Sequence, residues 1–144
     1  MRPYLKVACK PHRDALVRLL TSDHPFAIEQ LRRAVPPVPR ERRICRFCKR
    51  QWAVENEMHV LLECTDGRLE SLRMGFMDDA AVVMGHGLGE LCHRLSSSAF
   101  MDMLMSREKI TARLAEYVYE VSALAKSVPM LILADEAAFH ALPV

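Results

Sequence analysis

The 144-residue chain has few glycines, few aromatic residues and no long apolar run. Five glycines and eight prolines are too few for a collagen-like or low-complexity chain. Because aromatic residues make up only 6% of the chain, we expect a core built mainly of Leu, Val, Ala and Met. The longest apolar stretch, residues 128–134, is far shorter than the about 18 residues of a membrane helix. We therefore expect no membrane partner.

Signals for secretion and for catalysis are missing as well. The N-terminal residues lack the apolar stretch of a secretory signal. The odd number of cysteines, five, argues against a disulfide framework, so we expect an intracellular protein of the nucleus or cytoplasm. No nucleophile is paired with a base, and Glu116 and Glu120 are better explained as solvated helix charges than as a catalytic pair. We expect neither an enzyme nor a small-molecule substrate.

The hydrophobic content of 51%, with 26% charged residues, is typical of a folded domain. Apolar residues recur at helical spacing from Ile110 to Ala125, and Pro129 ends this helix. Asp66 is placed to cap a further helix, and no alternating strand pattern runs for more than a few residues. We predict a mainly α single domain, in which a basic helical segment with a metal motif (1–75) packs against a helical C-terminal region (76–144).

Shorter elements follow from the same reading. The segment from Thr21 to Asp23 offers N-cap chemistry for a helix with Pro25 in its first turn. That helix would bury a stripe formed by Phe26, Ile28, Leu31 and Val35. Further helices are predicted over residues 12–20, 58–64 and 131–142.

Charge is distributed unevenly along the chain. Residues 1–50 carry 13 Lys and Arg against 4 Asp and Glu, whereas residues 51–144 carry 7 against 14. The basic half is suited to nucleic acid, and the acidic half, with a Met-rich face (Met101, Met103, Met105), to a protein partner. The alternative is that the two halves attract each other and pack.

Four metal-ligating residues lie in order within twenty positions, in the pattern Cys45-x2-Cys48-x10-His59-x4-Cys64. Two cysteines separated by two residues fit one tight turn, so that both sulfurs reach the same ion. Soft sulfur ligands favour Zn²⁺ over Mg²⁺ or Ca²⁺, and four protein ligands leave no open position for catalysis. We therefore predict one structural zinc ion.

Each ligand also has an ordinary explanation. A single cysteine is often a small core residue, a CxxC pair can be a redox site, and His59 can be a surface histidine. A two-zinc ring of the ubiquitin-ligase type is disfavoured, because it needs eight ligands and only four are present in order. The remaining histidines (His12, His24, His86, His93, His140) have no partner at ligand spacing and are expected to bind no metal.

The string RRICRFCKRQWAVENEMHVLLEC resembles the zinc-binding segment of reverse transcriptases from non-LTR retrotransposons, fungal elements in particular. The likeness rests on the CxxC, the acidic stretch Val54-Glu55-Asn56-Glu57, and the motif from His59 to Cys64. Thr65 departs from the proline that many members carry there. No polymerase motif is present, so the resemblance implies a detached or domesticated piece that binds nucleic acid without polymerising it, or a nonfunctional remnant.

Basic and aromatic side chains crowd around the first two cysteines. Arg and Lys neutralise phosphates, and aromatic rings stack on unpaired bases; the resemblance implies RNA in preference to DNA. The candidate nucleic-acid-binding residues are Arg40, Arg42, Arg43, Arg46, Phe47, Lys49, Arg50 and Trp52. Alternatively, the segment is a solvated linker whose two rings pack on the core, or a nuclear import signal.

Overall fold

Helices form the fold of residues 1–85 and 87–144, the part of the chain that the computed structural model describes. They are α1 (Lys10–Leu20), α2 (Ala27–Gln30), α3 (Gly67–Met84), α4 (Leu88–Arg94), α5 (Ser97–Ser106), α6 (Thr111–Ser127) and α7 (Glu136–His140). In this part, β structure is limited to one antiparallel bridge between Ile44 and Val54. The predicted mainly α fold is confirmed. The expectation for His86 lies outside the described residues.

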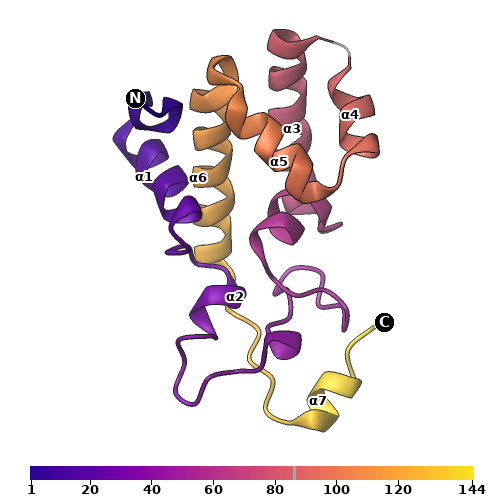
Figure 1. The fold of residues 1–144 in the computed structure, drawn as a ribbon. Coiled ribbons are helices and arrows are strands. Elements are labelled where there is room, and N and C mark those ends of the chain that lie inside the picture. Colours follow the sequence, from indigo (N-terminus) through magenta and orange to yellow (C-terminus); the bar gives the residue numbers. More distant parts are fainter. Residues whose placement is uncertain (86) are drawn as a thin grey trace.

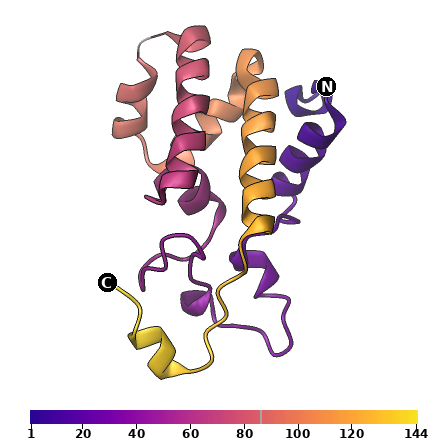
Figure 2. The ribbon, with the colours of Figure 1, turned by 180° about the vertical axis from the view of Figure 1, so that it is seen from behind.

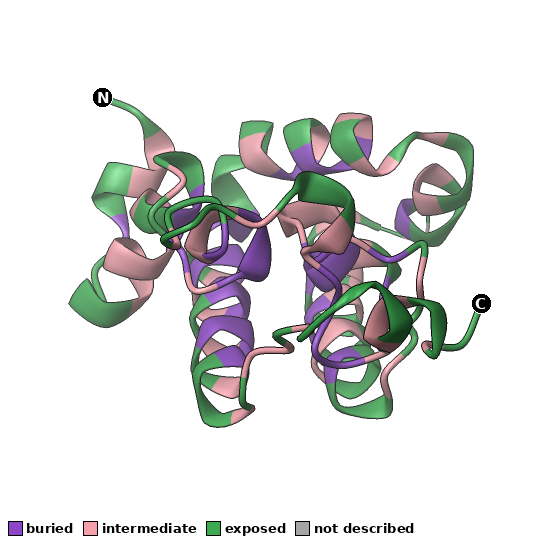
Figure 3. Cartoon of the chain, turned by 90° about the horizontal axis from the view of Figure 1, so that it is seen from below, coloured by how far each residue is buried: buried purple, intermediate pink, exposed green. Residues whose placement is uncertain are grey.

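Helix α6 is the central element, because α1 packs on one side of it and α3 on the other (Figures 1 and 2). Its buried residues, from Leu114 to Ala125, follow the helical spacing seen in the sequence. The Phe76 ring of α3 stacks on Tyr117 at 4.9 Å between ring centroids. Figure 3 shows the buried residues on the facing sides of the helices, as an amphipathic pattern requires.

Helix α4 lies beside α3, and α5 crosses one face of the pair formed by α3 and α6 (Figure 1). Phe100 and Leu104 of α5 are buried in the core. The predicted Met-rich face belongs to this core. Met101 is buried, and Met103 and Met105 are half-buried against the same cluster. These methionines therefore contribute to the core of the bundle. No described helix has the length and apolar character needed to cross a membrane.

Two predicted helices are shorter than expected. Helix α2 begins after Phe26, so Thr21 to Asp23 do not cap it, and it ends at Gln30. Val35 is 97% exposed instead of buried. The prolines that follow disfavour helical backbone in the preceding residue, and the chain folds back so that Val38 N–H donates to Leu31 O at 3.0 Å.

The predicted C-terminal helix over 131–142 is reduced to α7, which Asp135 caps by accepting the Ala138 N–H at 2.8 Å. By contrast, Asp66 caps α3 as predicted, accepting the Arg68 N–H at 3.0 Å.

The zinc motif predicted for residues 45–64 lies below the bundle, between α2 and α7 (Figure 1). Its buried residues share one hydrophobic cluster with those of α1, α3 and α6.

Candidate metal centre

Cys45 and Cys48 lie on a tight turn that closes a short hairpin-like loop. Cys45 N–H donates to Ala53 O at 2.8 Å, and Lys49 N–H donates back to Cys45 O at 3.0 Å. Lys49 has a left-handed backbone with φ of 52°, a conformation that L residues adopt at a cost. This reversal turns both cysteine side chains toward the same side of the loop.

His59 and Cys64 come from the two ends of a π-helical turn, η3 (His59–Glu63). The Cys64 N–H donates to His59 O at 2.7 Å, the i to i+5 bond of a π turn. An α-helix, with 3.6 residues per turn, would direct residues five apart to different faces. The wider turn brings the imidazole and the sulfur to one side. This explains why four residues separate His59 from Cys64.

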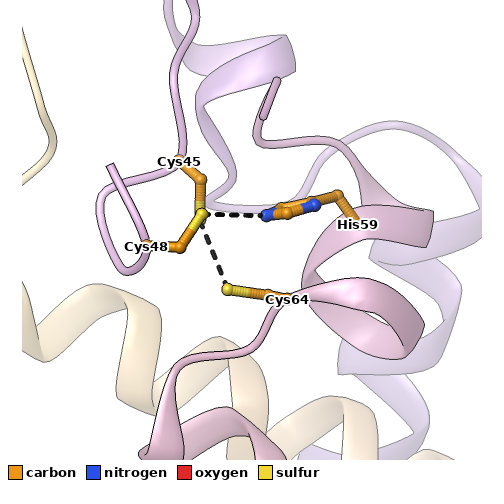
Figure 4. Close-up of side chains that lie close together, drawn as sticks. All are labelled: Cys45, Cys48, His59 and Cys64. Carbon is orange, nitrogen blue, oxygen red and sulfur yellow. Dashed lines mark hydrogen bonds between the residues drawn. The ribbon is translucent and has the colours of Figure 1, made fainter. Parts of the chain in front are cut away.

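The four predicted ligands meet at one point (Figure 4). Their donor atoms all lie within 4.8 Å of one another. The Cys45 and Cys64 sulfurs are 3.8 Å apart, and Cys48 Sγ lies 3.4 Å from His59 Nε2. Cys48 is half-buried and the other three residues are buried. Three sulfurs and one imidazole nitrogen at these distances are able to hold one metal ion in tetrahedral coordination.

The three sulfurs differ in how readily they lose a proton. A shared hydrogen bond with Cys64, together with burial, raises the pKa of Cys45. The same hydrogen bond lowers the pKa of Cys64 to about 4, so this sulfur carries a thiolate at neutral pH. Burial raises the pKa of Cys48 while the Arg50 backbone N–H opposes it. Metal ligation requires thiolates, and a cation would stabilise all three.

Neighbouring groups hold the ligands in place. Asn56 Oδ1 accepts the His59 N–H at 2.8 Å, and a Glu63 carboxylate oxygen lies 3.8 Å from His59 Nδ1. Carboxylates near the second ring nitrogen of a ligating histidine orient the ring. The Arg73 guanidinium of α3 donates to Leu61 O and Cys64 O, both at 2.9 Å. These contacts fasten residues 39–64, which we call the metal loop, to the bundle.

Two of the predicted nucleic-acid-binding residues lie in the interior. Arg46 is 3% exposed and Phe47 is 7% exposed. The Arg46 guanidinium donates to Glu55 Oε1 at 2.7 Å and to Ala125 O at 2.6 Å, and Arg68 covers the Phe47 ring. Neither side chain is free to meet a phosphate or a base. Their polar and aromatic groups instead join the metal loop to α6 and α3.

The other predicted residues lie at or near the surface. Arg43 is half-buried and donates to Val38 O and Ile28 O at 2.8 and 3.0 Å. Arg42 is half-buried against Glu136. The exposed members of the set are Arg40, Lys49, Arg50 and Trp52. The Trp52 ring stands edge-on to His59 with 6.1 Å between ring centroids, so this exposed ring adjoins one of the candidate metal ligands.

Comparison with protein-family models, curated proteins and solved structures found no match for this chain.

Proposed function

We propose that Cys45, Cys48, His59 and Cys64 hold one structural Zn²⁺, and that the loop around them binds single-stranded nucleic acid, RNA in preference to DNA. In this proposal the module derives from a retroelement reverse transcriptase and has no polymerase activity of its own. The motif resemblance and the geometry of the four donor atoms support it.

The donor set argues for zinc as the ion. Three thiolates and one imidazole in a closed tetrahedron are typical of structural zinc sites. Such ions contribute on the order of 10 kcal/mol to folding in small fingers, comparable to the whole stability of a small domain. The loop from Pro39 to Trp52 has little regular structure of its own, so a metal ion that binds with this free energy would order it.

The observation that carries the nucleic-acid proposal is the position of Trp52. Its side chain is 62% exposed, and the preceding Lys49 and Arg50 are exposed as well. An exposed aromatic face beside exposed cations is the combination that stacks bases while meeting the backbone phosphates. The His59 ring behind Trp52 gives the indole a fixed support.

Trp52 also supplies the test, because it is the only tryptophan in the chain. A single-stranded RNA of about 12 nucleotides, within the site sizes of such proteins, should quench its fluorescence. The dissociation constant should rise steeply with salt, as counterion release requires. A titration without quenching, with no salt-dependent binding of labelled RNA, would contradict the proposal.

Matched variants assign the effect to this loop. Fluorescence anisotropy of labelled RNA measures the affinity of each variant. Trp52→Ala should bind about 5- to 100-fold more weakly, which corresponds to the loss of stacking with one base. Lys49→Ala should weaken binding and lower the salt slope by about 1. Lys126→Ala removes an exposed cation of α6 and should bind like the wild type. Equal losses in both lysine variants would indicate unspecific charge attraction.

The alternative function is a zinc-stabilised protein-interaction module that binds a partner through the acidic helical half. It has less support from the methionines, because Met101 is buried and Met103 and Met105 are half-buried against the core. A nonfunctional remnant is the third possibility from the sequence. Both alternatives predict that RNA leaves the Trp52 fluorescence unchanged, so the same titration separates the nucleic-acid proposal from these two alternatives.

A further inference from the structure

The C-terminal segment, residues 129–144, lies against the metal loop although some ninety residues separate them in the chain (Figures 1 and 2). Gln51 makes most of the contact. Its side-chain amide donates to His140 O at 3.1 Å and to Leu142 O at 2.8 Å, and its backbone N–H donates to Pro143 O at 2.9 Å. The neighbouring Arg50 donates to Val144 O at 2.9 Å.

A second contact joins the same segment to Arg42. The Arg42 guanidinium pairs with the Glu136 carboxylate, and it lies over the Phe139 ring at 4.3 Å from the centroid. The segment therefore occupies Arg42 and Arg50, two of the cations that the sequence assigns to nucleic acid. A carboxylate and backbone carbonyls hold these cations as phosphate oxygens would.

The segment is held weakly despite these contacts. None of residues 129–144 is buried, and Glu136 has a side chain that is 67% exposed. A hollow of about 380 Å³, lined by Leu31, Pro36, Ile132 and Leu133 among others, separates part of the segment from the Pro-rich turn. Segments with few buried apolar contacts open at low free energy, and exposed ion pairs add little.

We propose that residues 129–144 are a cover in cis over the basic face of the metal loop, and that single-stranded nucleic acid displaces it. This inference rests on the proposed function. The anchor residues Arg50 and Gln51 lie between Cys48 and His59, so the ion that orders the loop also orders the cover. Displacement frees Arg42 and also Arg50, which is two residues from Trp52, and so adds two cations to the site.

Hydrogen exchange on the full chain tests the displacement. In the free protein, backbone hydrogen bonds of α7 and its C-cap, such as Ala141 N–H to Ala137 O at 3.0 Å, should slow the exchange of these amides. Saturating single-stranded RNA should speed exchange in residues 136–144 at least about threefold, while α6 keeps its protection. Unchanged or slower exchange in residues 136–144 with RNA bound would overturn the inference.

A charge-matched pair of variants tests the competition. Glu136→Gln with Phe139→Ala releases Arg42 and should tighten RNA binding about three- to tenfold at 0.1 M salt, the effect of one more phosphate contact. Glu90→Gln, in an exposed α4 pair with Arg94, changes the net charge equally and should leave affinity near that of the wild type. Equal effects in the two proteins, or weaker binding in the double variant, would refute the cover. Absence of RNA binding by the wild type would instead refute the proposed function.

Discussion

Arg46 and Glu55 form a buried ion pair that joins three parts of the fold. The guanidinium donates to both carboxylate oxygens, at 2.7 to 3.1 Å, and the two side chains are 4% and 0% exposed. Glu55 also accepts the Ala27 N–H at 2.8 Å, and Arg46 donates to Val128 O at 3.1 Å. The metal loop, α2 and the C-terminal end of α6 therefore meet at one charge pair.

Glu55→Gln should lower the free energy of unfolding by about 3–5 kcal/mol, because it leaves the buried guanidinium without its counterion. Urea unfolding followed by circular dichroism measures the change. The control is Glu108→Gln, which breaks an exposed pair with Lys6 and should cost less than about 1 kcal/mol. A loss of similar size in both variants would show that Arg46 finds other compensation.

Removal of one sulfur should abolish the metal site. Native mass spectrometry should find one zinc ion in the wild-type protein and none in Cys45→Ser. Hydrogen exchange should then show loss of protection over residues 40–65, because the ion would no longer join the turn that carries Cys45 and Cys48 to the π turn that carries His59. Cys9→Ser replaces an exposed cysteine outside the cluster and should retain the ion. A wild-type protein that folds without metal, or a variant with an unchanged thermal melt, would contradict the prediction.

Tyr117 should make stability sensitive to alkaline pH. Burial raises the pKa of its phenol to about 12, against about 10 in the unfolded chain. The folded state therefore holds the proton more tightly, and its contribution is complete below pH 10 and is lost as pH rises from 10 to 12. The free energy of unfolding should fall by up to about 2.7 kcal/mol over this range, measured by urea unfolding at each pH.

The phenylalanine variants isolate this effect. Tyr117→Phe keeps the stack on Phe76 but loses the hydrogen bond from the hydroxyl to Leu61 O, 2.6 Å long. It should cost about 1 kcal/mol at neutral pH and flatten the alkaline profile. Tyr119→Phe, 41% exposed on α6, should keep the wild-type profile. Parallel profiles for Tyr117→Phe and the wild type would assign the alkaline loss to other groups.

Local patterns in the sequence predicted α6 and the cap at Asp66. The ligand spacing also named the four residues that meet in space, because a turn and one short helix place them. Long-range pairing was not predictable in this way. Arg46 was assigned to nucleic acid because it lies in a basic stretch around the first two cysteines, yet its backbone partner Ala125 lies 79 residues away. The contacts of Gln51 with residues 140–143 likewise leave no periodic signal.

The left-handed backbone at Lys49 sets stability against affinity at a single position. A non-glycine residue at φ of 52° costs about 1–2 kcal/mol, so Lys49→Gly should raise the melting temperature of the zinc-loaded protein. The same change removes an exposed cation beside Trp52 and should weaken RNA binding. If Lys49→Gly both raises the melting temperature and weakens RNA binding, then the lysine at this position contributes to binding and lowers the stability of the fold.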